Sequence, residues 1–126
     1  MKKILMVDDD IEFLQASKAM IESAGYTVIT ANDANGGIRL AKDEFPHLVI
    51  LDVMMATDTE GFQVSRRLRD FPELGNLPVI LLTGIRKAMG VGPSIKPDEK
   101  WLPVCSIMDK PVAPEILLAE ISRLLN

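Results

Sequence analysis

Residues 1–10 read MKKILMVDDD, in which a run of four apolar residues ends abruptly in Asp8, Asp9 and Asp10. An apolar run of this length is typical of a buried strand, and buried carboxylates are costly unless they are paired or bind a metal ion. The stretch therefore predicts a core strand that brings acidic side chains to a site at its end. Asp10 stands where a helix N-cap would lie, so we interpret it as a cap rather than as a metal ligand.

The rest of the chain alternates between short apolar runs and amphipathic stretches, which is the pattern of an α/β protein with a parallel sheet. Strands are predicted over residues 3–7, 26–31, 48–51, 78–82 and 104–108, the second of them at an edge. Helices are predicted between Asp10 and Gly25, between Asn32 or Asp33 and Pro46, over residues 62–71, and from Pro114 to the end. No linker interrupts this pattern, so residues 1–126 are predicted to form a single domain.

The composition excludes several classes of protein. A net charge of −4 argues against direct contact with nucleic acid, and no apolar stretch approaches the roughly 20 residues that cross a bilayer. The one cysteine, Cys105, cannot form an internal disulfide, so we expect a cytoplasmic protein. We interpret the basic run of Arg66, Arg67 and Arg69 as a solvated helix face, and we assign no chemistry to His47, which we expect to be exposed.

Four of the five predicted strands end in polar side chains, namely Asp8 with Asp9, Asp52, Thr83 and Lys110. The carboxyl ends of the strands in an open parallel sheet share one edge, where ligands bind. Three carboxylates on that edge stay ionised only near cations, and hard oxygen ligands of this kind suit Mg²⁺. A divalent ion, a lysine and a hydroxyl around a central carboxylate would stabilise a phosphoryl group in transfer. The sequence therefore predicts phosphoryl transfer with Asp52 as the nucleophile.

Over essentially its whole length the chain resembles the receiver domain of two-component response regulators. The resemblance rests on ILMVDDD, LVILDVMM, PVILLTG and MDKP, which occur in the family's order and at roughly its spacing. It implies a doubly wound (βα)5 flavodoxin-like fold with a parallel five-stranded sheet of order 2-1-3-4-5. It also implies phosphorelay signalling, with a sensor histidine kinase or phosphotransfer protein as donor and a downstream protein as target. From the net charge and the lengths of the apolar stretches, we expect no direct contact with nucleic acid or membrane.

The resemblance further implies a role for each site residue. Asp52 would accept a phosphoryl group from a phosphohistidine, while Asp8 and Asp9 would hold Mg²⁺ together with Asp52. Met54 would add its backbone carbonyl to the metal ligands.

Two further site residues follow from the same resemblance. Thr83 would bind the phosphoryl oxygens and shift inward on activation, and Lys110 would pair with the acceptor carboxylate or its phosphate. We expect an acceptor that can dephosphorylate itself, not a turnover enzyme.

The chain departs from the family pattern in three places. The loop after Asp52 reads MMATDTEG, with Ala56 where the family usually has proline. Ile107 stands where an aromatic residue usually couples to the threonine. The segment over residues 85–103 is long and rich in Gly and Pro, so we expect an irregular fourth-helix region.

Two other functions fit parts of the pattern. A Mg²⁺-dependent phosphohydrolase would also use an aspartyl nucleophile, but it generally needs a second acid soon after the nucleophile, and Asp52 is followed by Val-Met-Met. A pseudo-receiver, which keeps the fold but binds its partners without phosphorylation, would suit the missing aromatic residue at Ile107. The phosphoacceptor remains the leading hypothesis.

Overall fold

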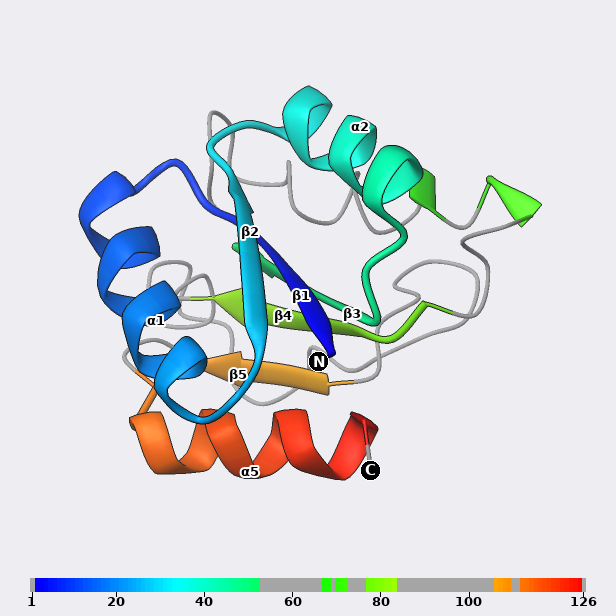
Figure 1. Ribbon diagram of the computed structural model, residues 1–126. Coiled ribbons are helices and arrows are strands. Elements are labelled where there is room, and N and C mark those ends of the chain that lie inside the picture. The colour runs from blue at the N-terminus through cyan, green and yellow to red at the C-terminus, as the bar shows by residue number, and fades with distance from the viewer. Residues whose placement is uncertain are drawn as a thin grey trace.

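The protein forms a parallel five-stranded sheet with helices on both faces (Figure 1). The computed structural model describes residues 2–52, 67–68, 70–72, 77–83, 106–109 and 112–125. The strands are β1 (Lys3–Val7), β2 (Thr27–Ala31), β3 (Leu48–Asp52), β4 (Val79–Thr83) and β5 (Ser106–Asp109). Their order is β2-β1-β3-β4-β5, and each neighbouring pair is parallel. The α/β fold class, the strand order and the edge position of β2 are confirmed.

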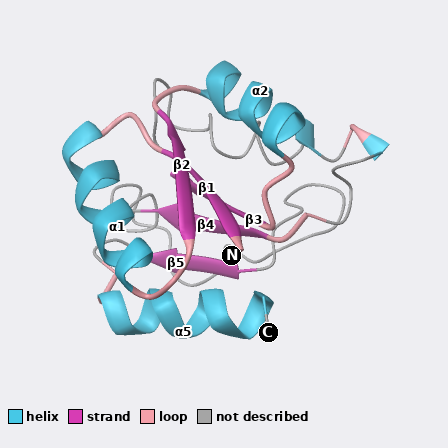
Figure 2. Ribbon diagram, viewed as in Figure 1, coloured by secondary structure: helices cyan, strands magenta, loops and turns pink. Residues whose placement is uncertain are grey.

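The described helices lie in two layers, one on each side of the sheet (Figures 1 and 2). They are α1 (Ile11–Ser23), α2 (Ala34–Glu44) and α5 (Pro114–Leu125). The α1 and α5 helices cover one face, and α2 covers the opposite face. Among the described residues, no helix is both long enough and apolar enough to cross a membrane.

The sheet separates two hydrophobic clusters, because successive side chains of a strand point to opposite faces. In β1, Ile4 and Met6 belong to the cluster under α1 and α5, whereas Leu5 and Val7 belong to the cluster under α2. All four residues are at most 1% exposed. A strand buried on both faces reads as a continuous apolar run, which is why residues 4–7 show no alternation.

Both N-terminal helices begin at an aspartate, as the sequence predicted. Asp10 caps α1 by accepting a hydrogen bond from the Phe13 backbone N–H at 3.1 Å. Asp33, rather than Asn32, caps α2 by accepting from the Gly36 N–H at 2.6 Å. These side chains satisfy backbone donors that have no partner inside their helix.

A glycine allows α2 to lie close to the sheet. A Cβ atom added to Gly37 would lie 2.7 Å from Cγ2 of Val7 and 3.1 Å from its Cγ1. Glycine in a helix costs about 1 kcal/mol relative to alanine. In α2 that cost is offset by close packing of the helix against β1.

The connection from α2 to β3 is tied to the first residue of β1. The Lys3 N–H donates to Nδ1 of His47 at 2.9 Å, and the His47 N–H donates to the Lys3 carbonyl at 2.8 Å. Lys3 Nζ also pairs with Glu44 Oε1 at 3.0 Å. His47 is exposed, as predicted, and it serves as a backbone acceptor that aligns β1 with the start of β3.

A polar cluster joins β5 to α5. The Ser106 hydroxyl donates to the Glu120 carboxylate, which also accepts from Arg123 Nε at 2.6 Å and from Arg123 Nη2 at 2.8 Å. Hydrogen bonds from Arg123 and then Ser106 lower the pKa of Glu120 from 4.5 to about 2. The cluster therefore favours an ionised Glu120 in the folded protein.

Several predictions fall outside the described residues. They concern the irregular segment over 85–103, the loop that contains Ala56, and most of the helix predicted over 62–71. Of that last helix the described residues include 67 and 68, which are helical, and Leu68 is buried beneath α2.

Candidate functional site

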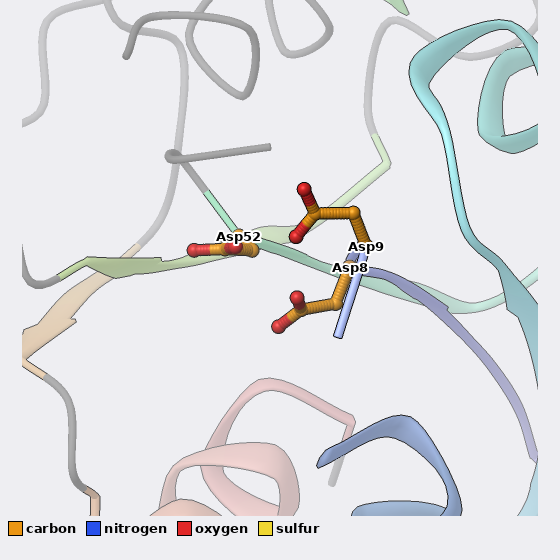
Figure 3. A group of neighbouring side chains, drawn as sticks. All are labelled: Asp8, Asp9 and Asp52. Atoms are coloured by element: carbon orange, nitrogen blue, oxygen red, sulfur yellow. The ribbon is translucent and has the colours of Figure 1, made fainter. Parts of the chain in front are cut away.

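Three carboxylates gather where β1 and β3 end (Figure 3). Asp52 is the last residue of β3, while Asp8 and Asp9 directly follow β1. The two strands are neighbours, and Val7 pairs with Leu51, so Asp8 and Asp52 lie one step beyond the last paired residues. One carboxylate oxygen from each of the three aspartates lies within 4.8 Å of the others. Adjacent central strands thus bring together residues that are more than forty positions apart in the sequence.

The three aspartates differ in exposure. Asp8 is 2% exposed and Asp52 is 5% exposed, whereas Asp9 is exposed. Removing two carboxylates from water is costly, and placing them beside a third adds repulsion between like charges. A cation bound at the exposed side would offset both effects. Asp8 and Asp52 therefore form a buried pair of carboxylates, and Asp9 is the member of the cluster that is exposed to solvent.

The backbone at the start of α1 supports this cluster. The Asp10 N–H donates to Oδ1 of Asp8 at 2.9 Å, while the Asp10 side chain caps α1. The Asp8 N–H in turn donates to the Ala31 carbonyl at 3.1 Å, which extends the β1–β2 ladder by one residue. The prediction that Asp10 is a cap is confirmed. Its backbone bond to Asp8 was not predicted, although an aspartate two residues before a helix cap is the sequence signal for such a contact.

The cluster suits a small, hard divalent cation. Mg²⁺ takes oxygen ligands at about 2.0–2.1 Å in an octahedral arrangement, so two oxygens on one ion lie about 3–4 Å apart. Oxygens that already lie within 4.8 Å need only a small adjustment to reach that spacing. Among the described residues the group consists of carboxylates alone, which matches the ligand preference of Mg²⁺ rather than Zn²⁺. The residues present fit the predicted metal.

The remaining predicted site residues are placed only in part. Thr83 is the last residue of β4, and its strand neighbour Leu82 pairs with Asp52, so the Thr83 backbone lies one step beyond Asp52 on the same edge. Thr83 pairs in turn with Asp109, the last residue of β5. Lys110 and Met54 lie outside the described residues, and their predicted roles stay predictions.

Ile107 lies in the middle of β5, paired with Leu81. Its side chain is partly buried and packs against the hydrophobic cluster beneath α2. The position where the family usually carries an aromatic residue is therefore filled here by a branched aliphatic side chain that contributes to the core.

Comparison with known proteins agrees with this geometry. The family model of the response regulator receiver domain matches residues 4–122. Protein PilH of Pseudomonas aeruginosa is 36% identical over 83 residues, which is 66% of this chain and 68% of PilH. The response regulator PleD of Caulobacter vibrioides is 31% identical over 97% of this chain, which corresponds to 26% of PleD.

A solved structure extends the comparison to the fold. The chemotaxis response regulator CheY4 of Vibrio cholerae superposes with a TM-score of 0.80 at 28% identity, covering 99% of each chain. The chain spans most of PilH and CheY4 but about a quarter of the length of PleD. The family model matches most of the chain and the sheet has the strand order that the resemblance implies, so the chain belongs to the response regulator receiver domain family.

Proposed function

We propose that the protein is a phosphoacceptor in two-component signalling, in which Asp52 receives a phosphoryl group in a Mg²⁺-dependent reaction. The observation that carries the proposal is the gathering of Asp8, Asp9 and Asp52 within 4.8 Å at the carboxyl edge of the sheet, in a chain of the receiver family. Two of these carboxylates are buried, so binding a cation relieves an unfavourable arrangement.

The proposed step is a displacement at phosphorus. A carboxylate oxygen of Asp52 attacks the phosphorus of a phosphohistidine, an oxygen–phosphorus bond forms and the phosphorus–nitrogen bond breaks. The imidazole leaves with the electron pair of that bond and takes up a proton. Mg²⁺ held by Asp8, Asp9 and Asp52 would neutralise the negative charge that builds up on the phosphoryl oxygens.

The other roles follow from the family resemblance. Met54 supplies a backbone carbonyl to the metal, Thr83 binds the phosphoryl oxygens, and Lys110 pairs with the acceptor carboxylate or its phosphate. The position of the Thr83 backbone, one step beyond the residue paired with Asp52, supports its assignment.

The proposal defines the partners by their chemistry. The donor is a phosphohistidine of a sensor kinase or phosphotransfer protein in the cytoplasm, and the recipient of the signal is a downstream protein. The chain acts as an acceptor that dephosphorylates itself rather than as an enzyme with repeated turnover. Neither nucleic acid nor a membrane is a direct partner.

Incubation with Mg²⁺ and acetyl phosphate, followed by intact-mass measurement, tests the proposal. The protein should gain one phosphoryl group, and the adduct should be absent with EDTA. Asp52→Asn should abolish it, whereas the matched control Asp43→Asn, an exposed residue of α2, should retain it. The same adduct on Asp52→Asn would show that Asp52 is not the acceptor.

A second candidate is a pseudo-receiver that binds its partner without phosphorylation. The observation in its favour is Ile107, which packs into the core at the position of the usual aromatic residue. Beryllofluoride with Mg²⁺ distinguishes the two. A phosphoacceptor should show chemical-shift changes around Asp52 and Thr83 on addition, whereas a pseudo-receiver should show none.

A further inference from the structure

A basic groove runs along the outer side of α2, away from the aspartate cluster. It lies between α2 and the segment that carries Arg67 and Phe71, and it has a volume of about 420 Å³. Three cations line it, Arg39 and Lys42 from α2 and Arg67 from the facing segment. Among the described residues that line it, Asp43 is the one acid. We refer to this feature as the α2 groove.

The charge of the α2 groove is opposite to that of the whole chain. The described lining residues, three cations and one carboxylate, sum to a charge of +2, in a chain with a net charge of −4. Among the described residues, Arg39, Lys42 and Arg67 form no salt bridge with a carboxylate. Lys42 instead places Nζ 4.5 Å from the ring centroid of Phe71, and Arg67 Nη1 lies 3.5 Å from Asn35 Oδ1. These cations are available to an external anion.

The floor of the α2 groove is apolar. Ile38 is 5% exposed, and Phe71 is partly buried against the hydrophobic cluster beneath α2. An aromatic ring beside lysine and arginine offers a surface for an apolar side chain whose neighbours in sequence are acidic. The groove thus combines an apolar floor with a cationic rim.

The α2 groove is separate from the aspartate cluster and from the face that α1 and α5 cover. The α2 helix lies on the opposite face of the sheet from α1 and α5 (Figure 1). The lining residues of the α2 groove include none of Asp8, Asp9 and Asp52. A segment bound only to these lining residues would therefore contact none of the three clustered aspartates.

We propose that the α2 groove docks an acidic segment of a partner protein, with carboxylates on Arg39, Lys42 and Arg67 and an apolar side chain beside the Phe71 ring that Lys42 covers. Charge complementarity selects an acidic occupant. Asp43 on the rim and the net negative charge of the chain disfavour the continuous phosphate backbone of a nucleic acid. A protein segment can place its carboxylates against the cations and keep Asp43 clear.

The test is binding of a short fluorescein-labelled glutamate peptide with one central leucine, measured by fluorescence anisotropy at low salt. The matched variants are Arg39→Glu in the groove and Lys18→Glu on the exposed side of α1. Each lowers the net charge by two, from −4 to −6, so their comparison separates an effect of position in the groove from an effect of net charge. Arg39→Glu should weaken binding about tenfold, and Lys18→Glu less than about twofold.

Three outcomes would overturn the proposal. Equal weakening by both variants would mean that only net charge matters, and equal binding of a peptide with glutamine in place of glutamate would exclude recognition of carboxylates. Binding of a labelled single-stranded oligonucleotide but not of the peptide would mean that the occupant is a nucleic acid. If Arg39→Glu unfolds, as judged by circular dichroism, Lys42→Glu, which also takes the net charge from −4 to −6, provides the same comparison. None of these outcomes bears on the phosphoacceptor proposal, because the two sites share no residue.

Discussion

The Asp10 N–H donates to the Asp8 carboxylate at 2.9 Å, and the Asp10 side chain caps α1, so one residue links the aspartate cluster to the first helix. The cluster is therefore held from two directions, by the ends of β1 and β3 and by the N-terminus of α1. These backbone contacts restrict the positions of the carboxylates, which lowers the conformational cost of binding a cation.

We expect Asp8→Asn to stabilise the protein in EDTA by about 1 kcal/mol, because it removes one of three neighbouring negative charges. The asparagine oxygen can still accept the Asp10 N–H. The same variant should lose the rise in melting temperature that excess Mg²⁺ gives the parent protein. Thermal unfolding in EDTA and in MgCl₂ measures both effects, and an unchanged response to Mg²⁺ would exclude Asp8 as a ligand.

Asp10→Ala should destabilise the protein by about 1 kcal/mol through loss of the α1 cap. Asp10→Asn should cost only a few tenths of a kcal/mol, since asparagine is an equally good cap, and it should leave the Mg²⁺ response intact. Urea unfolding of both variants checks the first effect and Mg²⁺ titration the second. Loss of the Mg²⁺ response in Asp10→Asn would contradict the assignment of this side chain to capping alone.

Gly37→Ala should destabilise the protein by about 1–3 kcal/mol, even though alanine favours helix, because its Cβ would lie 2.7 Å from Val7 Cγ2. Asn35→Ala, at an exposed position of the same helix, should change stability by less than about 0.5 kcal/mol. Urea unfolding gives both values. A Gly37→Ala protein as stable as the parent would mean that α2 can move away from β1 at little cost.

The Ser106–Glu120–Arg123 cluster predicts a loss of stability in acid. Glu120 has a pKa of about 2 in the folded protein against an ordinary value of 4.5, so its contribution is fully present above about pH 4.5 and is lost as the pH falls towards 2. The shift alone corresponds to roughly 3 kcal/mol. Arg123 is 62% exposed, so solvent screening should reduce this contribution to about 1 kcal/mol.

Urea unfolding of the parent and of Glu120→Gln, at pH values from about 7 down to about 3, measures this contribution. The difference in stability between the two proteins should be largest near neutral pH and should shrink as the pH falls below about 4.5. A difference that stays constant across the range would mean that the cluster acts without ionisation of Glu120.

The order of strands and helices along the chain could be predicted from the sequence, because the core strands are short runs of apolar residues. The predicted strand over residues 3–7 coincides with β1, since the change from apolar residues to acids marks the residue at which the strand ends. β2 begins at Thr27, one residue after the predicted start at Tyr26, because the Thr27 N–H is the first to pair, with the Lys2 carbonyl. Strand ends near polar residues were therefore predictable to within a residue.

Contacts between elements were not predictable in the same way. Glycine at position 37 is unfavourable in a helix when only the helix is considered, and its benefit depends on the distance to Val7 across the α2–β1 interface. His47 was given no role because the acceptor function of Nδ1 requires Lys3, which lies 44 positions earlier. The proximity of Asp8 and Asp9 to Asp52 could be predicted without any distance, because the carboxyl ends of the strands in a parallel sheet share one edge.

The side chains of β1 alternate between the two hydrophobic clusters. The register that packs the core correctly is therefore also the register that assembles the site. If β1 slipped by one residue against β3, Leu5 and Val7 would exchange faces with Ile4 and Met6. The same slip would carry Asp8 away from Asp52 by about 3.3 Å, the rise of one strand residue. A chain that has buried its β1 side chains correctly has therefore also brought its carboxylates together, and a misaligned chain would have neither a sound core nor a cation site.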